Sequence, residues 1–226
     1  MGITGQDATE AEGTGATPTA RALRALEYDD ASVRLSAALA VGTDPDPRHV
    51  DKLIERCASE PEFFVRDMLT WALTRHPVEL TLPRLLGELR SETAQARSQA
   101  LHTLSKLGDA RAWPAITRAH LCDPDDEVAR AAWRTAAVLV PEGEEPALAE
   151  VLVTQLGRGG RDTQLSLSRA LVELAGVTVS ALHAATQAAD PRVRTHALAT
   201  DRLRRAPDAG FEAAVEEAKR VVALGG

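Results

Sequence analysis

Aromatic residues make up only 3% of this 226-residue chain. Of the β-branched apolar residues Ile is rare and Val is far less frequent than Ala or Leu, which dominate the apolar composition. Strands favour β-branched and aromatic side chains, while Ala and Leu are good helix formers. The composition therefore predicts an all-α protein and argues against a sheet.

Long apolar runs are missing as well. No stretch approaches the eighteen or so apolar residues of a membrane span. Residues 1–17 lack the basic and apolar regions of a signal peptide, and we expect them to form a disordered tail before a single domain over 18–226. Cys57 and Cys122, the only cysteines, lie far apart on the apolar sides of expected helices. Two buried free thiols suit a reducing cytoplasm, and we predict a cytoplasmic protein without membrane contact.

Catalytic and metal-binding motifs are also absent. The sequence contains no H-E-x-x-H, C-x-x-C, G-x-x-x-x-G-K-[ST] or G-x-S-x-G pattern. Its 6 His residues are scattered, with no pair at ligand spacing on one helix. The formal net charge of −7 argues against a nucleic-acid partner. We therefore predict no metal and no cofactor, and we favour a non-catalytic role.

What the chain does contain is a repeated helical pattern. The stretch 61–76, wound as a helix at about 100° per residue, gathers one narrow apolar stripe. The stripe consists of Val65, Leu69, Ala72, Leu73 and His76. A similar stripe recurs about every 32 residues, and a second apolar series interleaves with it at the same period. One repeat must lie within 161–176, but the spacing does not fix its register.

Two interleaved series of one period predict helical hairpins. A single hairpin cannot bury its own stripe, so neighbouring hairpins must stack. We therefore predict a right-handed α-α superhelix of about six hairpins. A capping helix over 211–224 is expected to close its C-terminal end.

The pattern D-x-x-V-R, seen in DDASVR and DPRVR and in part in EFFVR and DDEVAR, resembles the second helix of short bacterial HEAT repeats. The resemblance covers about 20–224, and the run from Ala22 to Pro77 is also similar to HEAT domains of some actinobacterial MerR-type regulators. The winged-helix DNA-binding half of those regulators is not in this sequence. In the HEAT family the acidic residue and the Arg resemble an inter-repeat ladder. By that resemblance the ladder here would comprise Asp30, Arg34, Arg66, Arg97 and Arg194.

The candidate binding surface is the side of each second helix that lies away from the stripe. By analogy with HEAT solenoids, second helices line a concave groove. The predicted groove residues are Leu35, Leu39, Asp67, Thr70, Trp71, His102, Arg130, Trp133 and Arg134. They make a groove that is apolar at its N-terminal end and basic and aromatic in its middle. The alternative is that Trp71 and Trp133 pack between neighbouring second helices.

These patterns favour a non-catalytic scaffold that holds a protein segment or a ligand in its concave groove. A protein or peptide is the favoured partner, and a small molecule is the second possibility. One alternative is therefore a small-molecule sensor or a chaperone for a biosynthetic intermediate. Another is a HEAT-like DNA glycosylase, since Asp67, Trp71, Trp133 and Arg134 supply similar residue types. The acidic charge argues against that last reading.

Overall fold

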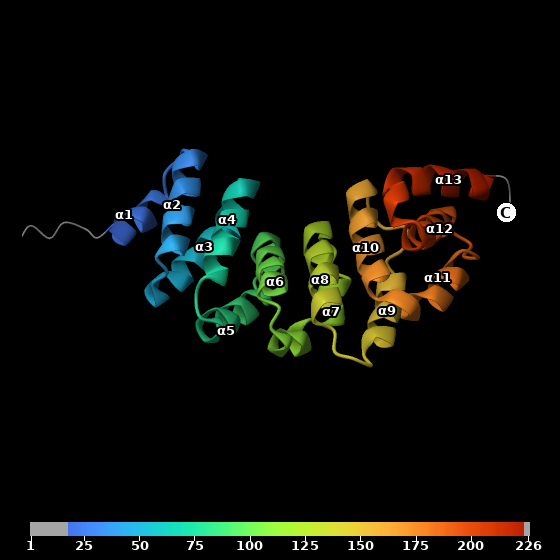
Figure 1. Ribbon diagram of the computed structural model, residues 1–226, viewed down its shortest axis with the longest axis horizontal. Coiled ribbons are helices and arrows are strands. Elements are labelled where there is room, and N and C mark those ends of the chain that lie inside the picture. Colours follow the sequence, from blue (N-terminus) through green and yellow to red (C-terminus); the bar gives the residue numbers. More distant parts are fainter. Residues whose placement is uncertain (1–17, 224–226) are drawn as a thin grey trace, which may run out of the picture.

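The computed structural model describes residues 18–223, and the predicted tail over 1–17 lies outside them, as do residues 224–226. Within the described range the chain is built of helices and contains no strand, which confirms the predicted all-α solenoid. Successive hairpins stack side by side along a shallow arc (Figure 1). The six hairpins of this range are followed by a terminal helix, α13 (Phe211–Ala223).

The second helices of the hairpins stand next to one another in one layer (Figure 1). Each contacts the second helix of the next hairpin. They are α2 (Ala31–Thr43), α4 (Phe63–Thr74), α6 (Ala94–Leu107), α8 (Asp126–Leu139), α10 (Arg161–Glu173) and α12 (Pro191–Arg205). The register of the fifth hairpin, which the repeat spacing left open, is thus set by the start of α10.

The first helices form the other layer and are shorter. They are α1 (Pro18–Ala25), α3 (Val50–Ser59), α5 (Val78–Glu88), α7 (Arg118–Leu121), α9 (Glu145–Val153) and α11 (Val179–Ala185). The fourth departs from the single helix that the apolar spacing after Trp113 suggests. A 3₁₀ turn over Ala110–Ala115 comes first, and Thr117 then starts α7 with a capping box to His120. Pro114 has no backbone N–H to donate, which favours this break.

The core lies between the two layers. All five residues of the stripe predicted over 61–76 are buried, as are Val50, Leu53, Ile54 and Cys57 of α3. At the C-terminal end α13 packs on α12 and buries Phe211 (Figure 1). Within 18–223 no single helix is long and apolar enough to cross a membrane, and α10 passes that test only when joined to the sharply bent segment 176–185.

The fourth residue of most second helices is an Arg that ties down the preceding loop. Its Nη1 donates to the carbonyl oxygens of the residues six and five positions earlier, at 2.6–3.0 Å. The residues that do this are Arg34, Arg66, Arg97 and Arg194. In α10 the equivalent Gln164 donates from Nε2 to the Gly159 carbonyl at 3.3 Å. In α8 the equivalent residue is Ala129.

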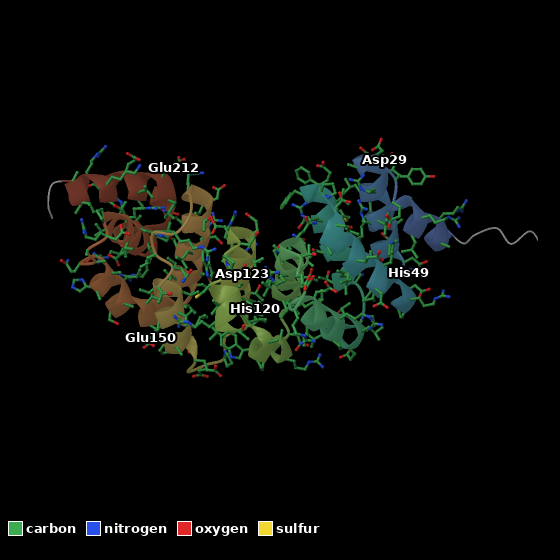
Figure 2. All side chains as sticks on the ribbon, turned by 180° about the vertical axis from the view of Figure 1, so that it is seen from behind. Asp29, His49, His120, Asp123, Glu150 and Glu212 are labelled. Atoms are coloured by element: carbon green, nitrogen blue, oxygen red, sulfur yellow. The ribbon has the colours of Figure 1, made fainter. Side chains whose placement is uncertain are left out.

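Two of these Arg residues also link neighbouring hairpins, as a ladder would. Arg34 donates from Nε and Nη2 to the two carboxylate oxygens of Glu60, each at 2.8 Å. Arg97 forms an ion pair with Asp123 at 3.1 Å. Figure 2 marks Asp123 and also Asp29, whose backbone oxygen accepts from Arg34.

The ladder differs from the predicted one in its acidic member. Asp30 does not face an Arg across hairpins; its Oδ1 accepts from the backbone N–H groups of Ser32 and Val33. That carboxylate is the N-cap of α2, where free N–H groups and the helix dipole favour negative charge. The same bonds lower the pKa of Asp30. The acids of the ladder instead lie in the loop that precedes the next second helix.

Candidate functional site

The ninth residues of the first five second helices form a row across the second-helix layer, whereas that of α12, Ala199, is buried. We call this set the ninth-residue row, and it consists of Leu39, Trp71, His102, Arg134 and Arg169. The row changes from apolar at α2 and α4 to basic at α8 and α10. Four of its members are exposed, and His102 is half-buried. The row is regular because each of five neighbouring second helices contributes the residue at the same helical position.

Trp71 anchors the apolar end and is both packed and exposed. The rim of its ring lies against α2 at Gly42, where a Cβ atom would come within 2.4 Å of the Trp71 Cζ3 atom. Arg75 stacks over the ring, with its Cζ 6.0 Å from the centroid. The residue nevertheless leaves 38% of its surface exposed, and Leu39 beside it on α2 leaves 47%. The two predicted roles of Trp71, binding and lateral packing, are therefore not exclusive.

Trp133 was expected to point outward, and that prediction is wrong. The side chain is fully buried, and its Nε1 donates to the Leu121 carbonyl at 2.8 Å. Arg158 stacks over its ring at 5.8 Å. Trp133 is the eighth residue of α8, one position before Arg134, which turns it about 100° around the helix and into the molecule. The set suggested for a glycosylase, Asp67, Trp71, Trp133 and Arg134, is therefore not assembled on one surface, because Trp133 is buried.

Thr70, also an eighth residue, is likewise buried rather than part of the groove. Its Oγ1 lies 3.4 Å from Oγ1 of Thr103 on the next second helix. An equivalent contact joins Ser168 to Thr200 at 2.7 Å. Thr70 and Ser168 therefore serve the lateral packing of second helices, the role that was the alternative considered for Trp71 and Trp133.

The other predicted groove residues are at least partly accessible. Asp67 is exposed, whereas Leu35 and Arg130 are half-buried. His102 Nε2 lies 3.9 Å from Asp67 Oδ1. Burial, followed by the charges of Arg134 and Lys106, nonetheless lowers the pKa of His102.

Several residues of this face were missed by the sequence interpretation. Phe64 is 74% exposed and lies seven residues before Trp71, on the same face of α4. Its helical spacing would have identified it. Arg169 and Ser166 of α10 were missed because the register of the fifth repeat was not fixed. Once α10 is known to start at Arg161, Arg169 falls in the ninth-residue row.

The basic end of the row borders a cleft between α8 and α10. We call it the arginine cleft, and it is lined by Arg130, Arg134, Asp162, Leu165, Ser166 and Arg169. Its volume is about 230 Å³. Guanidinium groups can bind anions by charge and by several directed N–H donors. Among residues 18–223 no three His, Cys, Asp or Glu side chains gather as a metal site would require.

Comparison with known proteins gives little more than a likeness of fold. The chain matches no protein-family model and no curated protein. Among solved structures it is similar to the complex of CpcE and CpcF of phycocyanin lyase from Nostoc sp. PCC7120. The alignment has 19% identity, covers 96% of this chain and 99% of that one, and gives a TM-score of 0.36. So distant a likeness does not say what the present chain binds.

Proposed function

We propose that this protein is a binding scaffold whose ninth-residue row holds a segment of a partner protein. The observation that carries the proposal is the exposure of large apolar side chains on two adjacent helices. Leu39, Phe64 and Trp71 leave 47%, 74% and 38% of their surfaces exposed. Aromatic side chains such as Phe64 and Trp71 are enriched in protein interfaces, and Trp is among the residues that contribute most to affinity.

The charge pattern narrows the kind of segment that this face would hold. Along the row the exposed apolar residues of α2 and α4 give way to Arg134 and Arg169. An extended partner lying across the layer would therefore place an apolar part on Trp71 and an acidic part near α8 and α10. Second helices lie about 10 Å apart, so four of them offer a span of roughly 30 Å. A segment of about ten extended residues covers that distance.

Affinity capture with matched variants tests this proposal. The wild-type protein, Leu39→Ala, Trp71→Ala and a control are immobilised, and proteins retained from the native extract are quantified by mass spectrometry. The control is Val179→Ala on the first-helix layer, since Val179 is 40% exposed and thus comparable to Trp71. A true partner is retained by the wild type and by the control and is lost with Trp71→Ala.

The retained protein is then purified and its affinity measured. Trp71→Ala should weaken binding by about 2 kcal/mol or more, which is roughly thirtyfold. Thermal unfolding of each variant separates a lost contact from a lost fold. If no protein distinguishes Trp71→Ala from Val179→Ala, or if the loss follows unfolding, the ninth-residue row is not the binding surface.

A further inference from the structure

The arginine cleft gathers three Arg side chains from two adjacent second helices. Arg134 and Arg169 occupy equivalent ninth positions on adjacent helices, and both side chains line the cleft. Among residues 18–223 neither lies within ion-pair distance of a carboxylate. Partial burial, followed by the charge of Arg130, lowers the pKa of Arg134. Two guanidinium groups without an ion-pair partner in the described part of the chain therefore line one cleft.

Arg130 contributes a third guanidinium, which is only partly satisfied. Its Nη1 donates to Glu127 at 2.7 Å, on the exposed side of the helix. Its Nε is buried and has no hydrogen-bond partner among the described residues. The one carboxylate that lines the cleft, Asp162, lies 3.6 Å from Arg161. Because Asp162 is paired with Arg161, its negative charge neutralises the Arg residues of the cleft less than an unpaired carboxylate would.

Ser166 supplies an independent sign that something polar is bound here. The residue is only 7% exposed, and its Oγ has no hydrogen-bond partner in the described part of the chain. Leaving a buried hydroxyl unpaired costs about 1–3 kcal/mol. Ser166 and Arg130 are two of the four residues of this range with such an unpaired buried atom, and both line the same cleft.

We propose that the arginine cleft binds the phosphoryl group of a phosphate monoester, with Arg130, Arg134, Arg169 and Ser166 as its donors. A carboxylate has two oxygens in one plane and a single charge. A phosphoryl group has three terminal oxygens and a charge between −1.5 and −2 at neutral pH. Three guanidinium groups and a hydroxyl match the second better, because they offer more donors and more charge than a carboxylate can use.

The phosphoryl group can come from a phosphorylated side chain of the partner segment or from a free small phosphate ester. The first source rests on the proposed function, since the cleft continues the ninth-residue row. The second does not depend on it. The phosphoryl chemistry is common to both, and the experiment is arranged to tell them apart.

Titration calorimetry with inorganic phosphate, at constant ionic strength and pH 7, tests the site itself. Saturable binding is expected for the wild type, and acetate should bind at least about tenfold more weakly. Arg134→Gln and Arg169→Gln should each weaken phosphate binding by roughly tenfold or more, and Ser166→Ala by roughly fivefold. Arg118→Gln is the matched control: Arg118 is an exposed Arg on the first-helix layer, and its replacement should leave binding unchanged.

The unfolding temperature of each variant shows whether weaker phosphate binding comes from a lost contact or from a destabilised fold. Because burial and the charge of Arg130 disfavour the charged form of Arg134, Arg134→Gln should melt at the wild-type temperature or slightly above it. The proposal is overturned if phosphate does not bind, if acetate binds as well, or if the Arg134→Gln, Arg169→Gln double variant retains full affinity. A loss of several degrees in Arg134→Gln would also overturn it, since that Arg would then be structural.

Two further probes identify the source. A phosphoserine peptide that binds at least tenfold more tightly than glycerol phosphate indicates a phosphorylated protein segment. The reverse order indicates a small phosphate ester, and either order supports the cleft as a phosphoryl site. If phosphate binding depends on Arg134 and Arg169 while Trp71→Ala changes no partner, the proposed function fails and the phosphoryl site remains.

Discussion

Replacing Glu60 with Gln should destabilise the protein more than any surface change of the same chemistry. The Glu60 side chain is fully buried where the first two hairpins meet. It accepts from Arg34 at 2.8 Å through both oxygens, from Arg56 at 2.8 Å, and from the backbone N–H of Glu62 at 2.9 Å. Removing one partner from a buried ion pair typically costs about 3–5 kcal/mol, because the remaining charges are left without compensation.

Gln keeps the shape and one acceptor oxygen, so we expect the lower end of that range, about 3 kcal/mol. For a chain of this length that corresponds to a fall in Tm of about 6–12 °C. Urea unfolding followed by circular dichroism measures the difference. Glu55→Gln is the control: Glu55 pairs with Lys52 at 3.3 Å but is 72% exposed, and its loss should change stability by less than about 1 kcal/mol.

The stability that Glu60 contributes should depend on pH. Burial alone would raise the pKa of Glu60, but the hydrogen bonds from Arg34, Glu62 and Arg56 outweigh it and lower the pKa from 4.5 to about 2. Between those values the unfolded chain binds more protons than the folded one, so this contribution is lost as pH falls from about 4.5 to about 2. The wild type should therefore lose its advantage over Glu60→Gln in that window. Equal stabilities of Glu60→Gln and Glu55→Gln at pH 7 would refute the reasoning.

Two other predictions follow from close packing. Gly42→Ala should lower the unfolding free energy by about 1–3 kcal/mol, because its Cβ would lie 2.4 Å from the Trp71 ring and 2.8 Å from Ala72 Cα. Gly87→Ala, where a Cβ meets nothing within 4 Å, should raise the unfolding free energy by about 0.5–1 kcal/mol. Urea unfolding of both variants measures these changes. Changes of the same sign in the two variants would contradict the packing described at Gly42 and Gly87. In thiol titration of the native protein Cys57 should stay unreactive until unfolding, because burial raises its pKa to about 12; rapid modification would contradict this.

The sequence was sufficient for the architecture because the repeat is a packing pattern. Val65, Leu69 and Leu73 must face the core in any stacked hairpin, and their spacing says so directly. Whether residues beside that stripe are buried could not be predicted from their spacing alone. Thr70 and Trp133 precede the ninth-residue row by one position, and only their contacts in the fold show that they turn inward, Thr70 toward the next second helix and Trp133 toward Leu121 of α7.

The basic end of the candidate site was predictable only in part. Arg130 and Arg134 were identified from α8, but their partners across the cleft lie on α10. The acidic loop before α9 and the glycines at 157, 159 and 160 shift the repeat spacing there, so the position of Arg169 depended on where α10 begins. The acidic partners of the Arg ladder were missed for a related reason, since they lie in loops outside the repeated pattern.

The three Trp indole N–H groups offer the most direct test of the ninth-residue row as the binding surface. Each gives one resolved signal in a ¹H–¹⁵N spectrum, from exposed Trp71, half-buried Trp113 and buried Trp133. When the partner retained by affinity capture is added to the labelled protein, the Trp71 signal should shift or broaden, and the Trp113 signal on the first-helix layer should not move. A shift of Trp113 with Trp71 unchanged would place the partner on the other layer and contradict the account.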